Sequence, residues 1–470
     1  MTAPATGAEA ARRSDRRPTG FDRRLVAPMI LGAVLNPINS SMIAVALIPI
    51  GAAFGAPPSR TAWLVSALYL ATAVGQPVVG RLVDRYGPRR LYLVGTALTG
   101  VAGVLGTVAP SLGVLVVARV LLGIGTCAGY PAAMSLLRHE SRRTGQDNPG
   151  GVLTALAISA QTVSAVGPSL GGLLIGLGGW HTIFAVNIPL SAACLILGAM
   201  RMPRSTATAP GGGPDLPGMA LFAGLLGAVL LLLMNPRVEY LWLLPVAVAA
   251  GAGLVVRELR TTDPFLDLRV LGGNLPLIAT YARNLLTFTV SYAWLYGYTQ
   301  WLEEGRGLSA STAGLILLPL FLTAIAVSAL TGRRRGVRGK LLVGAVTQLA
   351  ACGLLLVVHP GSGTWLLVAV AMLAGVPQGL LGLANQNALY HQAEPARIGS
   401  SAGLLRTFTY LGAMVAAAAS AATFGDGADT AGLHELALVM LVSAVLLLLV
   451  VLVDRSLRRI GRPTDSTTAA

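Results

Sequence analysis

Three arginines inside long apolar runs are the residues of this chain with the clearest chemistry. Arg119, Arg283 and Arg406 each interrupt an apolar run of about 20 residues or more. A guanidinium at the centre of a membrane-spanning helix costs about 2.5–3.5 kcal/mol on insertion scales. We therefore expect Arg119 to face the protein interior or a wet cavity, unless backbone carbonyls satisfy it. Arg283 and Arg406 have no carboxylate nearby in the sequence, so a cavity that they border would be cationic and would suit an anionic or neutral ligand.

A second candidate is the charged segment 80–90, which reads Gly-Arg-Leu-Val-Asp-Arg-Tyr-Gly-Pro-Arg-Arg between two apolar runs. Glycine followed by proline breaks a helix, and this charge density does not sit in hydrocarbon, so we predict a tight loop at a membrane face. Asp84 could interact with a helix dipole or pair with an arginine of another part of the chain. Such a contact can hold one conformation and break in another; the alternative is that Asp84 only stabilises the fold. The candidate gating residues are Gly80, Asp84, Arg85, Gly87, Arg89 and Arg90.

Polar side chains within the apolar runs form a third set of candidates. Amides and aromatics in a mostly apolar cavity suit an amphipathic organic ligand, and interhelical hydrogen bonds are the alternative. The candidate cavity residues are Asn36, Asn39, Ser41, Gln161, Arg283, Asn284, Asn385 and Arg406. Proline removes a helical hydrogen bond and glycines permit close helix packing. We therefore predict a helix bend with a close-packing face at Gly167, Pro168, Gly171 and Gly172.

The elements that hold these residues are predicted to be membrane-spanning helices. Of the 470 residues, 54% are hydrophobic and only 11% are charged, whereas a soluble domain carries roughly 25% charged residues. The apolar runs are long enough to cross about 30 Å of hydrocarbon as helices, and the sequence lacks the short alternating segments of an outer-membrane barrel. The fold class is thus an all-α integral membrane protein in a lipid bilayer. The net charge of +15 does not indicate nucleic acid as a partner, because the arginines lie in short loops between apolar runs.

Fourteen apolar spans can be drawn, and the basic residues predict their orientation. With the N-terminus inside and the sides alternating, 28 of the 34 lysines and arginines fall inside, and only Arg60, Arg237 and Arg306 fall outside. This bias predicts that both termini are cytoplasmic. The predicted spans are residues 25–50, 61–79, 91–108, 111–137, 150–178, 182–201, 217–235, 239–257, 275–301, 309–331, 340–359, 364–390, 398–424 and 432–454.

The spans group as six, two and six. Segment 332–340 holds the place in the last six that segment 80–90 holds in the first six, but it lacks the aspartate. A duplication of six-helix halves explains this, and related halves are common in transporters. The region 201–217, rich in Pro, Gly, Ser and Thr, is predicted to be a flexible linker without chemistry. The predicted domains are a cytoplasmic tail 1–24, a six-helix bundle 25–202, a linker with two extra helices 203–262, a second six-helix bundle 263–455 and a tail 456–470.

Signatures of catalysis and of cofactor binding do not occur in the sequence. There is no phosphate-binding Gly-x-x-x-x-Gly-Lys-Ser/Thr, so ATP is not expected to be the energy source. The three cysteines, Cys127, Cys194 and Cys352, lie in apolar runs without metal-ligand spacing, which is typical of small core residues. We predict no metal, no cofactor and no enzymatic activity.

Several of these motifs resemble those of the major facilitator superfamily. Segment 80–90 resembles its loop signature, segment 119–125 its fourth-helix motif, and segment 163–172 the fifth-helix motif of its antiporters, with valine in place of the first glycine. Segment 179–189 resembles the start of helix six in multidrug exporters, and segment 264–269 the stretch before helix nine in the fourteen-helix branch. The resemblance covers nearly the whole chain. It implies a fourteen-helix drug:proton antiporter with a substrate cavity between two six-helix bundles, in which Arg119 is tied to proton coupling.

The first span departs from the pattern of that branch. The matching helix usually has an acid two residues before a threonine; here Asn39 takes the place of the acid and Ser41 that of the threonine. Asparagine can hydrogen-bond a substrate but cannot titrate. Proton coupling is therefore implied by the resemblance and not by a residue at this position.

Together these observations predict a secondary active exporter of small, drug-like or antibiotic-like organic molecules. It would work by alternating access, driven by protons, as a monomer in the inner membrane of a bacterium. The alternatives are a dedicated exporter of a natural product or metabolite, or a facilitator without proton coupling. A polytopic membrane enzyme or receptor is more remote, because an enzyme would need interfacial clusters of His, Asp and Glu that the sequence lacks.

Overall fold

The computed structural model describes residues 21–56, 58–61, 63–144, 150–204, 215–234, 238–262, 264–332, 334, 336–424, 427–458 and 460. These residues form helices and connecting turns, with no β-strand among them. Parts of the predicted tails 1–24 and 456–470, most of the predicted linker, and Arg333 and Arg335 of segment 332–340 lie outside the described residues.

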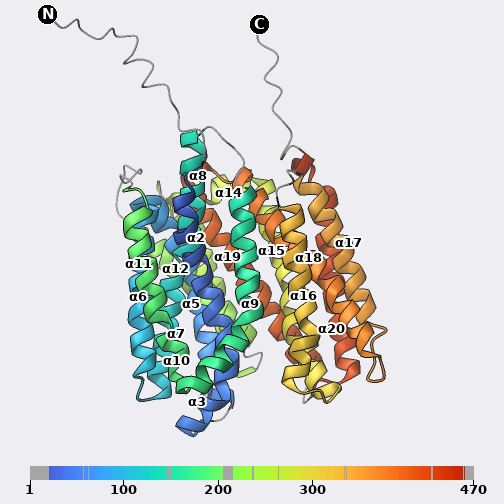
Figure 1. Cartoon of the computed structure of the whole chain (residues 1–470). Helices are drawn as coiled ribbons and strands as arrows, with labels where there is room; N and C mark the ends of the chain where they lie inside the picture. Colours follow the sequence, from blue (N-terminus) through green and yellow to red (C-terminus); the bar gives the residue numbers. More distant parts are fainter. Residues whose placement is uncertain are drawn as a thin grey trace, which may run out of the picture.

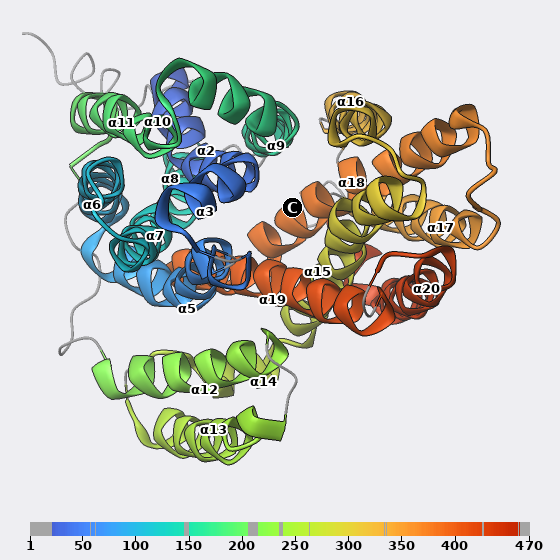
Figure 2. The ribbon, with the colours of Figure 1, turned by 90° about the horizontal axis from the view of Figure 1, so that it is seen from below.

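The helices fall into two bundles and a separate pair (Figures 1 and 2). The first bundle contains α2 (Val26–Met42), α3 (Leu47–Phe54), α4 (Pro58–Thr61), α5 (Trp63–Tyr86), α6 (Pro88–Thr107), α7 (Leu112–Thr126), α8 (Gly129–Thr144), α9 (Gly150–Gly178), α10 (His181–Ala185) and α11 (Asn187–Arg201). The pair is α12 (Leu216–Met234) and α13 (Leu243–Arg260), followed by the short α14 (Leu268–Gly273). The second bundle contains α15 (Leu275–Ala293), α16 (Ala310–Thr331), α17 (Val337–Leu355), α18 (Thr364–Gln392), α19 (Ile398–Phe424) and α20 (Thr430–Val453).

The predicted all-α membrane fold with fourteen spans is confirmed. Thirteen stretches of the described residues are helical, long and apolar enough to cross a membrane. The remaining span is α15, which continues through two π-helical turns, Trp294–Tyr298 and Trp301–Gly305. It is less apolar because polar side chains such as Arg283 and Asn284 point into the protein, where both are buried. The ninth span, predicted over residues 275–301, is therefore less apolar than the other thirteen, and its helical turns between α14 and α16 complete the count.

Both ends of the described chain lie at the same end of the molecule, at the top of Figure 1. We call this the termini end. Because helices alternate in direction, α5 and α18 finish at the termini end, whereas α9 and α19 begin there. In the view from the opposite end, α5 of the first bundle and α19 of the second run side by side, with α12 alongside them (Figure 2).

The predicted loop over segment 80–90 is wrong in its extent. Helix α5 continues to Tyr86, and α6 begins at Pro88, so the break is Gly87 alone. Gly87 has a φ of 89°, in a region that L side chains rarely adopt, and proline is well suited to the first position of the next helix. The 24 residues of α5 span about 36 Å, more than the hydrocarbon thickness. Asp84 and Arg85 therefore lie on the last helical turn, where charge is tolerated.

The end of the predicted linker is more ordered than its composition suggests. Asp215 is buried and accepts a hydrogen bond from the side chain of Arg257 at 2.7 Å, which ties the start of α12 to the end of α13. Its other oxygen accepts from the backbone amide of Phe265 at 3.4 Å. Glu258 is 1% exposed and accepts from the amide of Leu266 at 3.1 Å. Carboxylates thus hold the pair α12–α13 against the segment that leads into α14.

Candidate functional site

Asp84 joins the two bundles at the termini end. Its carboxylate accepts hydrogen bonds from the backbone amides of Gly399 and Ser400, each at 2.7 Å, and from the Ser400 hydroxyl at 2.6 Å. These amides belong to the first turn of α19, which has no helical acceptors for them and carries the positive end of the helix dipole. The side chain at the end of a first-bundle helix therefore caps the start of a second-bundle helix. Of the two partners that the sequence suggested, a helix dipole and an arginine, the structure shows the start of a helix, with two backbone amides and a hydroxyl as the donors.

Glycines allow α5 and α19 to approach closely beside this cap. A Cβ at Gly80 would contact the carbonyl oxygen of Gly399, and a Cβ at Gly399 would lie 2.8 Å from the carbonyl oxygen of Gly80. About one turn further along, a Cβ at Gly403 would contact the carbonyl oxygen of Gln76. Thr407 continues this face and donates its hydroxyl to the carbonyl of Ala73 at 2.8 Å. A larger residue at any of the three glycines would force the two bundles apart here.

The other predicted gating residues lie around this contact. Arg85 lies 6.0 Å from the centre of the Tyr86 ring. Arg89 donates to the carbonyl of Ala199 at 2.7 Å, which links α6 to α11 within the first bundle. Arg90 is exposed. The structure thus brings Gly80 and Asp84 to the interface between the bundles, while Arg89 binds within its own bundle.

Further contacts between the bundles lie at or near the termini end. The Tyr390 hydroxyl of α18 donates to the carbonyl of Leu137 of α8 at 3.5 Å, and the Arg138 guanidinium lies 5.2 Å from the Tyr390 ring centre. Gln161 of α9 donates to the Ser328 hydroxyl of α16 at 3.4 Å. At the end of α16, a Cβ at Gly332 would contact the Thr154 side chain of α9. Small residues and single hydrogen bonds make these contacts, beside an apolar core to which both bundles contribute, for example through Leu137 and Leu389.

Arg119 lies in a buried polar network of the first bundle. The side chain is 1% exposed; its Nε donates to the carbonyl of Leu64 at 2.8 Å, and Nη1 to the carbonyl of Asn39 at 3.1 Å. Its Nη2 has no hydrogen-bond partner among the described residues. Backbone carbonyls thus satisfy part of this guanidinium, as expected from the sequence for the case in which Arg119 does not face a wet cavity.

Asn39 forms a reciprocal amide pair with Asn187 of α11. Each Nδ2 donates to the other Oδ1, at 2.7 and 2.9 Å, and the two residues are 1% and 0% exposed. In this conformation Asn39 is an interhelical contact and does not line an open space.

Asn36 is also buried, and its Oδ1 accepts from the Tyr410 hydroxyl of α19 at 2.7 Å. It therefore connects the two bundles.

Arg283 has a carboxylate partner, which corrects the expectation from the sequence. Its Nη1 pairs with Asp454 at 2.5 Å, and Nε donates to the Asn385 side chain at 3.4 Å. Arg283 is 0% exposed, and the Asp454 side chain is 8% exposed. The aspartate follows α20, 171 positions further along the chain. Arg283 is thus neutralised inside the second bundle and does not make a cavity cationic.

The remaining predicted cavity and packing residues do not form one site. Asn284 is buried and donates to the carbonyl of Leu405 at 2.9 Å and to the Thr409 hydroxyl at 2.8 Å, within the second bundle. Ser41 donates to the carbonyl of Pro37 one turn earlier, at 2.9 Å.

Two of the four residues of the predicted close-packing face of α9 lie against another part of the first bundle. A Cβ at Gly167 would contact Ser41 of α2, and a Cβ at Gly171 would lie 2.8 Å from the Val45 side chain. Pro168 and Gly172 are exposed, and a Cβ at Gly172 would meet no atom within 4 Å. Helix α9 is continuous from Gly150 to Gly178 with Pro168 inside it. The two glycines that pack therefore serve the contact between α9 and α2.

Arg406 differs from the other two intramembrane arginines. Its guanidinium lies 4.1 Å from the centre of the Tyr130 ring, so a second-bundle cation sits over a first-bundle aromatic. The residue is half-buried, and no carboxylate or hydrogen-bond acceptor pairs with its guanidinium among the described residues. The Tyr130 hydroxyl is buried and also lacks a partner in the described part of the chain. Residues 403, 406, 407 and 410 share one face of α19, the face that contacts the first bundle.

Four tyrosines from both bundles meet next to the face of α19 that contacts the first bundle. We call Tyr69, Tyr292, Tyr296 and Tyr410 the tyrosine cluster. The rings of Tyr69 and Tyr410 lie 5.7 Å apart, as do those of Tyr292 and Tyr296. The hydroxyls of Tyr69 and Tyr296 are 2.9 Å apart. The π-helical turn that begins at Trp294 holds Tyr296 in this position, and such turns frequently occur at functional sites.

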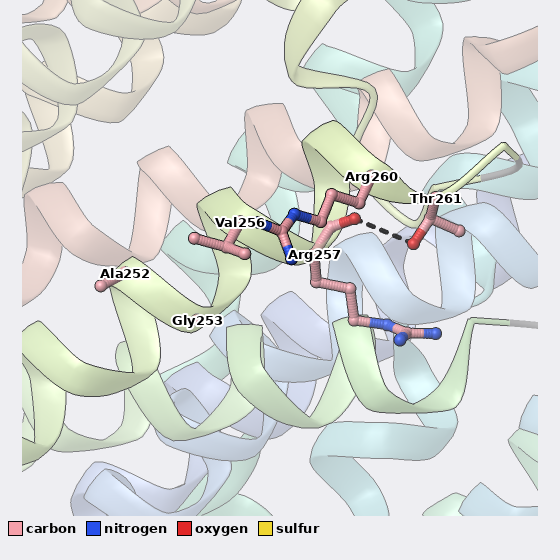
Figure 3. Close-up of a pocket in the computed structure, with 6 residues that line it drawn as sticks. All are labelled: Ala252, Gly253, Val256, Arg257, Arg260 and Thr261. Carbon is pink, nitrogen blue, oxygen red and sulfur yellow. Dashed lines mark hydrogen bonds between the residues drawn. The ribbon is translucent and has the colours of Figure 1, made fainter.

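A surface hollow of about 540 Å³ lies elsewhere, along α13 of the extra pair (Figure 3). Thr261 donates its hydroxyl to the carbonyl of Arg257 there, at 2.9 Å. The lining residues are Ala252, Gly253, Val256, Arg257, Arg260 and Thr261. All of them come from one end of α13 and its following residue, so this hollow is separate from the contact between the bundles. Across the described residues, no group of three His, Cys, Asp or Glu side chains could hold a metal ion.

Several residues that now stand out were missed from the sequence. Asp454 was placed at the end of the last span, and its pairing with Arg283 depends on the return of α20 beside α15. Tyr130 lies in an apolar run, and only the fold brings it under Arg406. Glu258 is buried with its Oε1 unpartnered in the described part of the chain. For Asn187 a signal existed, because it belongs to the motif in segment 179–189.

Known proteins resemble this chain along most of its length. A family model described as Major Facilitator Superfamily matches residues 29–417. An uncharacterized MFS-type transporter, YwoD, of Bacillus subtilis is 32% identical over 88% of this chain and 92% of its own length. The lincomycin resistance protein of Streptomyces lincolnensis is 31% identical over 90% of both chains. Among solved structures, the human organic anion transporter MFSD10 superposes with a TM-score of 0.65 and 16% identity, covering 90% of this chain and 99% of that one. This last likeness concerns the fold alone.

Proposed function

The chain belongs to the Major Facilitator Superfamily, and from this premise we propose that it is a secondary active exporter of drug-like or antibiotic-like molecules that works by alternating access. Membership makes it a multi-pass membrane transporter of small molecules and not an enzyme. Export is supported by its likeness to the lincomycin resistance protein, because moving an antibiotic out of the cell confers resistance. A dedicated exporter of one natural product fits the same relatives.

The observation that carries this proposal is the nature of the contact between the bundles. Asp84 binds the first turn of α19 through three hydrogen bonds, and glycines hold the two helices at backbone distance. These hydrogen bonds form only when the two bundles are in contact at this end. Breaking them separates α5 from α19 and leaves both helices folded. Transporters with two helical halves reach alternating access by rocking such halves against each other. The predicted gating role of Asp84 fits this arrangement.

We further propose the setting in which the exporter works. It lies as a monomer in the bacterial inner membrane with both termini in the cytoplasm, as the bias in basic residues predicts. The conformation described above is then closed toward the cytoplasm. The proposed domains keep the boundaries 1–24, 25–202, 203–262, 263–455 and 456–470.

The proton gradient is the proposed driving force, supported by the resemblance to the drug:proton antiporter branch. A facilitator without proton coupling is the second candidate, and Asn39 favours it. This residue takes the place of the usual acid and is paired with Asn187. Carboxylates that could replace the missing acid are found elsewhere, at the half-buried Asp84 of α5 and at the buried Glu258 of α13.

The experiment is transport by the purified protein in liposomes under an imposed pH gradient, with lincomycin and a panel of cationic, neutral and anionic drugs. Antiport predicts that at least one compound moves several times faster than in protein-free liposomes, and that an ionophore that collapses the gradient abolishes the difference. Transport that persists unchanged after the collapse would establish the facilitator instead. Movement of every compound at the protein-free rate would contradict the exporter proposal.

A further inference from the structure

The structure assigns the anionic end of the substrate to Arg406 and Tyr130, and we propose that the transporter selects aromatic molecules that carry a carboxylate or another acidic group. This inference deepens the proposed function and rests on it. It names a site and a substrate class for the central contact between the bundles.

The first step is the difference in charge balance between Arg283, which is buried, and Arg406, which is half-buried. Arg283 lies at 0% exposure with a carboxylate at 2.5 Å, so its charge is cancelled within the protein. Arg406 lies on the α19 face toward the other bundle and has no such partner in the described part of the chain. Charged groups away from water are normally paired. An arginine left without a partner at this place can receive its counter-charge from a ligand.

The second step is the unpartnered hydroxyl beside it. Tyr130 is 3% exposed, its ring carries the Arg406 guanidinium at 4.1 Å, and its hydroxyl has no hydrogen-bond partner among the described residues. A hydroxyl and a guanidinium both donate. A single carboxylate could accept from both groups, and arginine binds carboxylates through two parallel hydrogen bonds. The hydrogen-bond donors of Arg406 and Tyr130 that lack acceptors could therefore both be satisfied by one carboxylate of a ligand.

The third step concerns the rest of the ligand. Tyr410 of the tyrosine cluster lies one helical turn after Arg406, on the same face of α19. The cluster draws rings from α5, α15 and α19 and the turn after α15, so both bundles contribute to it. Aromatic rings stack on one another in offset or tilted arrangements. An aromatic body with an acidic substituent fits these two features, whereas a lipophilic cation would meet an uncompensated positive charge.

The test is binding and transport of two fluorescent probes, the anion carboxyfluorescein and the cation ethidium. We expect the purified wild-type protein to bind carboxyfluorescein more tightly than ethidium, by fluorescence polarisation. Arg406→Gln should weaken carboxyfluorescein binding at least tenfold, equivalent to about 1.4 kcal/mol, and leave ethidium binding equal or tighter. Tyr130→Phe, which keeps the ring, should weaken carboxyfluorescein binding to a smaller degree. Arg406→Lys keeps the charge and should retain intermediate affinity, which guards against a misfolded Gln variant.

Arg201→Gln is the matched control, because Arg201 is an exposed arginine at the end of α11. Unchanged carboxyfluorescein binding by Arg406→Gln, or tighter binding of ethidium by the wild type, would overturn the anion site. The two proposals can fail separately. Selective binding of carboxyfluorescein without transport in liposomes would refute the exporter and leave the site in place. Transport of both probes with equal efficiency would refute the site and leave the exporter.

Discussion

At the scale of single residues, the charge of Asp84 has the most direct consequence. Its oxygens receive two amide hydrogen bonds and one hydroxyl hydrogen bond from the start of α19. Hydrogen bonds to charged groups contribute about 1.5–3 kcal/mol each, more than neutral ones. Because donor and acceptor belong to different bundles, this free energy stabilises one conformation of the transporter rather than one helix. The same carboxylate would lose all three partners when the bundles separate at this end.

We predict that Asp84→Asn shifts the protein away from the conformation closed at the termini end. The neutral amide keeps only one acceptor oxygen, and its NH2 group faces the amide donors of α19. The ratio of closed to open protein should therefore fall about tenfold, equivalent to roughly 1.4 kcal/mol. The measurement is the rate at which a thiol reagent labels Thr154→Cys in a cysteine-free background. Thr154 is 8% exposed and lies against the second bundle at Gly332. The labelling rate should rise about tenfold.

Asp429→Asn is the matched control for this change. Asp429 also caps a helix, accepting from the amide of Gly432 at 2.7 Å, but the helix it caps directly follows it in the second bundle. It should leave the labelling rate at Thr154→Cys near that of the parent. An equal rise in both variants would show that the effect is general destabilisation and not the loss of a contact between bundles.

The sequence identified the candidate functional residues more reliably than it identified the groups that these residues contact. Arg119 could be singled out because charge is costly at the centre of a membrane-spanning helix, and Asp84 because its charged segment interrupts two apolar runs. Their partners are backbone groups on distant helices, such as the amides of Gly399 and Ser400, and backbone groups leave no mark in the sequence. The partner of Arg283 is a side chain, but it lies 171 positions away. Only the packing of α20 against α15 brings Asp454 beside it.

At the scale of helices, the contact between α5 and α19 depends on three glycines. Gly80, Gly399 and Gly403 let the two backbones touch, and the Asp84 cap can form only at that distance. The sequence marked Gly80 as important but interpreted it as part of a loop. The helix runs through it to Tyr86 because α5 is longer than the membrane is thick. The length of α5 carries the helix beyond the hydrocarbon, and Gly87, with a φ of 89°, and Pro88 decide where it ends.

We predict that Gly403→Ala abolishes most transport. The added Cβ would contact the carbonyl oxygen of Gln76 and lie 2.9 Å from the Cα of Pro77, and backbone atoms cannot rotate away as a side chain can. Overpacking of this kind costs about 1–3 kcal/mol, which should reduce liposome transport to roughly a tenth or less. Gly176→Ala is the control, because no atom lies within 4 Å of a Cβ at Gly176 in α9. Alanine is the better helix former, so this control should keep full transport and an equal or higher melting temperature.

At the scale of the whole molecule, the two bundles meet through an apolar core that both share and through a set of polar contacts at the termini end. The fold class and the number of spans were predictable from hydropathy and basic residues, because the membrane imposes both. The closing contacts were not predictable, because they depend on the angle between the bundles. They include Asp84 with the start of α19, Tyr390 with Leu137, and Thr154 beside Gly332. If the transporter works by alternating access, these contacts must all break in each cycle.

A reversible cross-link at the termini end tests this requirement most directly. In a cysteine-free background, Thr154→Cys and Gly332→Cys place two thiols where α9 and α16 touch, since a Cβ at Gly332 already reaches the Thr154 side chain. We predict that oxidation of the double variant in liposomes stops transport and that reduction restores it, while either single variant is insensitive to the oxidant. Undiminished transport by the fully cross-linked protein would contradict alternating access through this contact.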